Sequence, residues 1–99
     1  MKNVPPFKLI LEPLNDEAKN LSPFKWADEN VGKRHQLGGD PSFIQEDEIP
    51  ICPDCKQKMS FYGQLDSIND DYVIADCGMI YIFFCFDCNE VKAIESNCP

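Results

Sequence analysis

The chain has 99 residues, and its 17 acidic residues against 9 basic ones give a formal net charge of −8 at pH 7. This length predicts a single domain, residues 1–99, with a core of modest size. The excess of acid argues against nucleic acid or an anionic membrane as the partner and favours a basic protein. Prolines rather than an apolar run follow Met1 and Lys2, and no run reaches the ~18 apolar residues of a membrane helix. We therefore expect a cytoplasmic protein.

The N-terminal third predicts one strand and two short helices. Phe7–Leu11 alternates apolar and polar side chains, which is typical of a half-buried strand. Asn15 is a suitable N-cap for a helix over Asp16–Leu21. Ser22-Pro23 is a suitable start for a second helix, which Gly32 would end. Both helices are too short to be stable alone, so we expect them to pack on a sheet.

Residues 33–41 combine the chain's one basic cluster, Lys33-Arg34-His35, with the glycine pair Gly38-Gly39. Two glycines accept positive φ and can turn successive N–H groups toward one point. One interpretation is an anion or carboxylate site that includes His35, for example for the C-terminus of a partner. The other is a tight turn before a strand over Ser42–Gln45, and it is favoured because no phosphate-loop pattern is present.

Three further strands are predicted in the C-terminal half, over Met59–Leu65, Met79–Phe84 and Val91–Glu95. The first two pair antiparallel if the chain turns at Asp70-Asp71. The run Ile80–Phe84 is apolar on both faces. This predicts a central strand, covered by helices on one side and by further chain or a partner on the other. The expected fold class is mainly β, a small α+β domain with an antiparallel sheet.

Two cysteine pairs, Cys52-Pro-Asp-Cys55 and Cys85-Phe-Asp-Cys88, carry the clearest chemical signal. Each spacing lets both sulfurs of a pair face one point, and antiparallel pairing of the strands between them brings the pairs together. Four thiolates form the closed tetrahedral set of a structural zinc ion. We predict one structural zinc in a ribbon-like hairpin, with Cys77 and Cys98 as free thiols.

Other interpretations of the cysteines are less favoured. A three-disulfide framework needs an oxidising compartment. A thioredoxin-type redox site needs its first cysteine at a helix N-terminus, whereas the flanks of Cys52 are strand-like. Catalytic zinc needs an open coordination position, which four thiolates do not leave. Zinc ribbons also bind nucleic acid, but few basic residues lie near these pairs.

In chain order, the sequence carries the glycine pair within His35–Gln45, the first cysteine pair, the run Met59–Asp66, the aromatic run Gly78–Cys85 and the second cysteine pair. Taken together, this order resembles the YwqG-like family of bacterial proteins. It more distantly resembles the programmed cell death protein 2 family, which is related to ribosome-biogenesis chaperones. The resemblance implies a mainly β domain that binds a protein client, in some relatives within toxin–immunity systems. Longer members carry additional β units, so a client groove shared between units would be absent here or completed by dimerisation.

We therefore predict a non-enzymatic, zinc-stabilised module that binds a basic protein in a chaperone-like or immunity-type role, or that forms a homodimer. The candidate binding residues are His35, Gly38, Gly39 and Gln64. The alternative is a hydrolase or nucleic-acid-processing enzyme that uses His35, Gln64 and Asp66, because the last two lie on one face of a predicted strand. Hydrogen bonding within the fold explains the same polar residues equally well.

Overall fold

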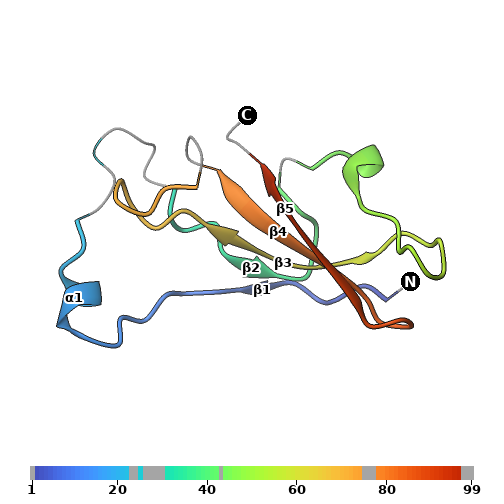
Figure 1. Cartoon of the computed structure of the whole chain (residues 1–99). Helices are drawn as coiled ribbons and strands as arrows, with labels where there is room; N and C mark the ends of the chain where they lie inside the picture. Colours follow the sequence, from blue (N-terminus) through green and yellow to red (C-terminus); the bar gives the residue numbers. More distant parts are fainter. Residues whose placement is uncertain (1, 23–24, 26–30, 43, 75–77, 97–99) are drawn as a thin grey trace.

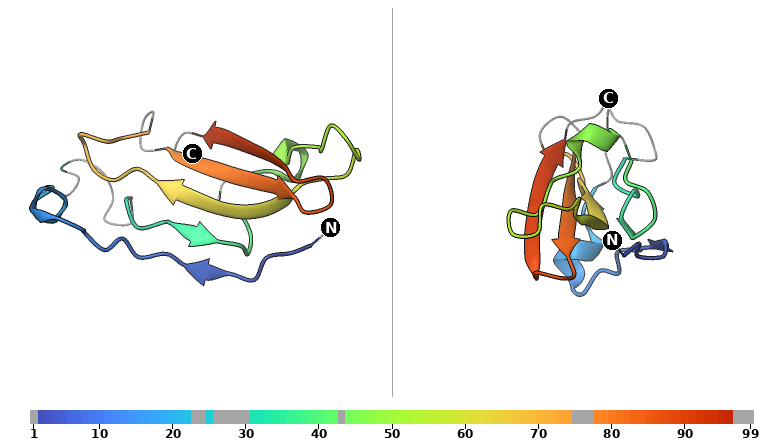
Figure 2. Two further views of the ribbon diagram at one scale, coloured as in Figure 1. Left: turned by 60° about the horizontal axis from the view of Figure 1, so that its bottom comes forward. Right: turned by 90° about the vertical axis from the view of Figure 1, so that its right-hand side faces the viewer.

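The computed structural model describes residues 2–22, 25, 31–42, 44–74 and 78–96. Their strands form one five-stranded antiparallel sheet in the order β1-β2-β3-β4-β5. The elements are β1 (Phe7–Lys8), the short helix α1 (Asp16–Lys19), β2 (Gln36–Leu37), the 3-10 turn η1 (Glu46–Glu48), β3 (Ser60–Asp66), β4 (Met79–Cys85) and β5 (Glu90–Ser96). Figures 1 and 2 show the strands as one twisted layer. The predicted mainly β fold is confirmed.

The three long strands form the centre of the sheet. β4 lies between β3 and β5, so that Ile80 pairs with Leu65 on one side and with Glu95 on the other. Alternate residues of β4 are buried on one face, as expected for a strand whose side chains have a period of two. The prediction that Met79–Phe84 is an internal strand is confirmed.

One face of the sheet forms the core. The buried side chains of β4 on this face are Met79, Tyr81, Phe83 and Cys85. The ring of Phe61 packs against that of Phe83, with centroids 5.7 Å apart. Ile44, Ile49, Cys52 and Met59 join the same cluster from the segment that precedes β3. This face is therefore covered by an irregular segment that passes through η1 (Figure 1).

Helix α1 begins as predicted but takes no part in that cover. Its N-cap is Asn15, whose side-chain oxygen accepts the N–H of Ala18 at 2.8 Å. The helix ends at Lys19 rather than Leu21, and none of its residues is buried. The prediction that short helices cover the sheet is wrong for α1, because its residues offer no apolar stripe to pack. Residues 23–24 and 26–30 of the second predicted helix lie outside the described residues.

The first strand is shorter than predicted. Of the expected Phe7–Leu11, only the first two residues pair with β2, and Leu9 adds an N–H bond to the carbonyl of His35 at 3.2 Å. Ile10 and Leu11 continue beyond the sheet and are 82% and 53% exposed. The partner strand β2 lies within the segment that was expected to be a turn, and at two residues it is too short to show a periodic pattern.

The strand expected over Ser42–Gln45 is wrong, because the described residues of this segment follow an irregular path. Side chains of the sheet take the backbone groups that a neighbouring strand would need. The N–H of Ser42 donates to Oε1 of Gln64 at 3.0 Å, and its carbonyl accepts the hydroxyl of Tyr81. Polar side chains that bond to the backbone in this way compete with a strand ladder.

The opposite face of the sheet is apolar and remains partly exposed. Cross-strand pairing places one row of residues side by side over all five strands: Phe7, Leu37, Gly63, Ile82 and Ala93. The radius of gyration of 14.8 Å exceeds the ~13 Å of a compact chain of this length. Both observations agree with a single sheet that is covered on one side.

Candidate metal centre

Two turns of the same backbone shape present the cysteine pairs. In each, the residue after the second cysteine has a positive φ, 64° at Lys56 and 59° at Asn89. The N–H of Lys56 donates to the carbonyl of Cys52 at 2.9 Å, and that of Asn89 donates to the carbonyl of Cys85 at 2.8 Å. Positive φ is common for asparagine and uncommon for lysine. The same closed turn therefore occurs twice, although the residues that complete it differ.

The surrounding structure holds these turns in place. An isolated bridge between Ile51 and Lys58 closes the base of the first turn, and the N–H of Met59 donates to the carbonyl of Pro50 at 2.9 Å. Pro53 restricts the backbone inside this turn, because its ring fixes φ. The second turn joins β4 to β5 and is therefore the tip of the central hairpin.

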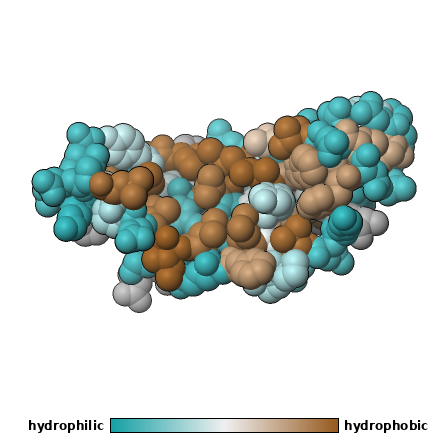
Figure 3. All heavy atoms as spheres, turned by 90° about the horizontal axis from the view of Figure 1, so that it is seen from below, coloured by the Kyte–Doolittle hydropathy of each residue, from teal (hydrophilic) through white to brown (hydrophobic). Residues whose placement is uncertain are grey.

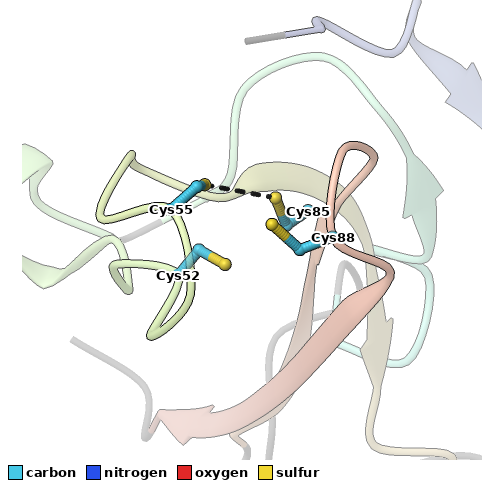
Figure 4. Close-up of side chains that lie close together, drawn as sticks. All are labelled: Cys52, Cys55, Cys85 and Cys88. Atoms are coloured by element: carbon cyan, nitrogen blue, oxygen red, sulfur yellow. Dashed lines mark hydrogen bonds between the residues drawn. The ribbon is translucent and has the colours of Figure 1, made fainter.

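The four cysteine sulfurs meet between the two turns (Figure 4). All four Sγ atoms lie within 4.8 Å of one another, and those of Cys55 and Cys85 are 3.7 Å apart. A tetrahedral ion with metal–sulfur distances of ~2.3 Å requires sulfurs ~3.8 Å apart. None of the four is in a disulfide. The cluster fits one metal ion.

The thiols influence one another's ionisation. The backbone N–H of Cys55 holds the pKa of the Cys52 thiol below its ordinary value. The N–H of Gln57 acts in the same direction at Cys55, but burial and the neighbouring thiols outweigh it and raise the pKa of Cys55. Burial raises the pKa of Cys88 to about 12. Four sulfurs this close ionise together only around a cation, so metal binding and thiol deprotonation are linked.

A second constellation, built on Gln64 and Asp66, lies on the core face of β3. The carboxylate of Asp66 accepts the backbone N–H groups of Gly32 at 2.7 Å and Arg34 at 3.0 Å, and it pairs with the Arg34 guanidinium at 2.7 Å. Burial acts to raise the pKa of Asp66, but the bonds from Arg34 outweigh it and hold that pKa below its ordinary value. Gln64 donates to the carbonyl of Arg34 at 2.8 Å. These side chains hold the chain before and within β2 against the sheet.

His35 lies beside this constellation. Its ring is buried, and its Nδ1 accepts the backbone N–H of Asp66 at 3.0 Å. The proton of the neutral ring then lies on Nε2, which has no hydrogen-bond partner within the part of the chain that the structure describes. The structure thus brings together the three residues of the enzyme alternative, His35, Gln64 and Asp66. Hydrogen bonds within the fold already engage the last two, and the enzymatic alternative stays an untested prediction.

Gly38 and Gly39 both adopt positive φ, at 63° and 70°. Their N–H groups donate to the carbonyls of Tyr62 and Val4, each at 2.8 Å. A Cβ on Gly38 would lie 2.2 Å from the carbonyl oxygen of Pro5, so the glycine allows the N-terminal segment to pass closely. An anion would have to displace both N–H bonds. These contacts agree with a tight turn, and a binding role for the pair stays a prediction.

Comparison with known proteins does not assign the chain to a family. No family model and no solved structure match it. The chain is similar to the uncharacterised protein YpfL of Salmonella typhimurium, with 41% identity over 56 residues. The match covers 54% of this chain and 12% of that protein, so the chain spans a small part of the relative's length. The resemblance to the YwqG-like family stays a prediction. Within the described residues, no helix has both the length and the apolar character needed to cross a membrane.

Proposed function

We propose that the chain is a zinc-stabilised, non-enzymatic module that binds a basic protein through the face of its sheet that the described residues leave uncovered. The four-cysteine cluster supports the metal part of this proposal. Tetrahedral sites with four sulfur ligands in proteins are typical of zinc, and in a reducing compartment these thiols stay available as ligands. Such a closed set leaves no coordination position for water or substrate, so the role of the ion is structural.

The position of the cluster shows what such an ion would stabilise. Cys52 and Cys55 belong to the segment that covers the core face, whereas Cys85 and Cys88 belong to the β4–β5 hairpin. An ion bound by all four would fasten the cover to the sheet. This matters in a chain of 99 residues, because a core of this size supplies little stability by itself.

The observation that carries the binding proposal is the apolar face on the other side. Figure 3 shows apolar side chains gathered along the middle of this face, between polar ends. A groove of ≈ 370 Å³ runs over it, lined by Tyr62, Ile82, Phe84, Phe86 and Val91. Tyr62, Leu65 and Val91 are 41%, 41% and 65% exposed. Apolar surface that is contiguous and rimmed by polar residues is typical of a protein-binding site.

Acidic residues beside this face favour a basic partner. Glu95 lies in register with Ile80 on the same face and is exposed. Asp87, which is exposed, follows Phe86 of the groove. A four-thiolate zinc site would add about −2 to the net charge, because four negative charges form around one divalent ion. The electric field of these negative charges would steer a cationic surface toward the groove. Its main effect would be to raise the association rate.

The proposal is tested with a variant that removes apolar surface without touching the core. Tyr62→Ser combined with Val91→Ser changes two exposed side chains of the groove, and Leu14→Ser combined with Tyr72→Ser changes two that are 95% and 54% exposed elsewhere. Metal-loaded protein and both variants are used to capture partners. Each captured partner is then purified, and its affinity for the unchanged protein and for both variants is measured. We expect a basic partner whose affinity falls for the groove variant and is unchanged for the control.

The charge of the partner is tested separately. Association should slow from low to physiological salt, because charges at a rim are screened within ~8–10 Å. Glu95→Lys should slow association more than it speeds release. An acidic partner, or a partner bound equally by the groove variant, would refute the proposal. Self-association of the purified protein, lost in the groove variant, would instead identify a second copy as the occupant of this face.

A further inference from the structure

We propose a second site, independent of the apolar face, that binds a carboxylate carrying a short apolar group beside the end of β2. The starting observation is the Nε2 atom of His35, a buried N–H donor for which the described residues offer no partner. Buried donors in folded proteins are nearly always hydrogen-bonded. A buried donor that has no partner and belongs to a side chain lining a cavity is suited to donate to an acceptor atom of a ligand there.

Two adjoining cavities meet at this histidine. Their volumes are ≈ 550 Å³ and ≈ 370 Å³, and Lys8, Lys33 and His35 line both. Each volume is within the ~300–1,000 Å³ that is usual for small-molecule sites. The three shared residues are therefore the place where one ligand would contact both cavities.

The larger cavity is basic, although the chain is acidic. Among the described residues that line it are three of the chain's 9 basic side chains, Lys8, Lys33 and Arg34, and one acidic side chain, Asp40. The guanidinium of Arg34 is bound to the buried Asp66. Lys8 and Lys33 are both exposed and supply the positive charge for a ligand. Positive charge in this cavity favours the binding of an anion.

The smaller cavity adds an apolar wall. It is lined by Leu9, Ile10 and Leu11, which continue past the end of β1, and by Gly32 opposite. Ile10 and Leu11 are 82% and 53% exposed, so an apolar group lying on them would remove surface from water. A carboxylate near the two lysines with an apolar group on this wall uses both cavities. An inorganic phosphate would use the basic part alone.

Two sources offer this chemistry, a free short-chain carboxylic acid and the C-terminal apolar residue of a peptide. The chain's single histidine makes its imidazole ¹⁵N signals unambiguous in an NMR titration. Hexanoate should perturb the Nε2–H signal of His35, and hexanamide, which keeps the apolar chain without the charge, should bind more weakly. A peptide that ends in leucine should bind with a free C-terminus and lose affinity when amidated. The source is a peptide if it binds at least tenfold more tightly than hexanoate, and a free acid otherwise.

Three variants test the residues. Lys8→Gln and Lys33→Gln should each weaken carboxylate binding about 2- to 5-fold, the range of exposed ion pairs. Lys92→Gln removes the same charge from β5 and should change nothing. His35→Asn keeps an acceptor for the N–H of Asp66 and removes the Nε2 donor, so it should weaken binding while the metal is retained. If the His35→Asn variant fails to fold, the two lysine variants decide whether the proposal holds.

The proposal would be overturned if hexanoate and the free peptide left the His35 signal unchanged. It would also be overturned if hexanoate and hexanamide bound equally, or if both lysine variants bound like the unchanged protein. Because these variants lie away from the groove of Tyr62 and Val91, a negative result here leaves the proposed partner surface unaffected, and the reverse also holds.

Discussion

Removal of one metal ligand should unfold the protein rather than loosen it locally. The best residue for this test is Cys55, because it is only half-buried and its replacement by serine removes little packing. Structural zinc contributes an apparent ~10–16 kcal/mol in zinc-finger peptides. The whole unfolding free energy of a small domain is ~5–15 kcal/mol. Loss of the ion therefore removes as much free energy as the fold has in total.

The structure explains why loss of the ion would unfold the whole domain and not only the cysteine turns. Cys52 and Cys85, both buried, lie in the same cluster as Phe83 and Met59. The isolated bridge at Ile51 and the backbone bonds around Cys52 stay within this segment, so without the ion its apolar contacts with the core are the main interactions that hold it over the sheet. Exposure of the core face should follow, and with it loss of the sheet.

The assay combines metal analysis with unfolding. Reduced, tag-free protein should contain one zinc ion per chain, and cobalt should give the absorption spectrum of a tetrahedral thiolate site. Cys55→Ser should lose the metal and the cooperative melting transition. Cys77→Ser and Cys98→Ser, which replace cysteines outside the described residues, should keep both. Metal-free protein that melts at the same temperature as the metal-loaded protein would refute the reasoning.

Three further predictions concern the sheet and its polar residues. Phe83→Ala should lower the unfolding free energy by ~3–5 kcal/mol in denaturant titrations, because Phe83 is fully buried against Phe61; an unchanged midpoint would contradict its central position. Asp66→Asn should cost ~3–5 kcal/mol, since it leaves the Arg34 guanidinium without its buried partner, whereas the exposed Asp71→Asn should stay within ~0.5 kcal/mol. Burial raises the pKa of Tyr81, so the folded state prefers the neutral phenol. The stability that Tyr81 contributes is therefore complete below the ordinary pKa of ~10 and is lost as pH rises through the higher pKa of the folded state. In an absorbance titration, Tyr81→Phe should lack the late phenolate step; an identical titration curve would contradict the burial of this hydroxyl.

Features that depend on local spacing could be predicted from the amino-acid sequence. The three long strands follow from alternation and from aromatic and β-branched content, and the structure confirms the central place of β4. The N-cap at Asn15 is visible in the sequence, because a cap acts on backbone groups three residues away. The two C-x-x-C pairs indicated the four cysteines that could hold a metal ion, since a turn of four residues fixes the separation of its own sulfurs. In each case, the residues that form the recognisable pattern lie close together along the chain.

The assembled fold was needed to show which segment covers the sheet and which polar residues hold it there. No pattern links Arg34 to Asp66, or Ser42 to Gln64, because these contacts join positions far apart in the chain. The same bonds explain why β2 forms and why the strand expected at Ser42 does not. Whether one face of an apolar strand stays uncovered is likewise a property of the assembled fold. It depends on where the irregular segment before β3 lies, and that path is set by cysteines and polar side chains drawn from both halves of the molecule.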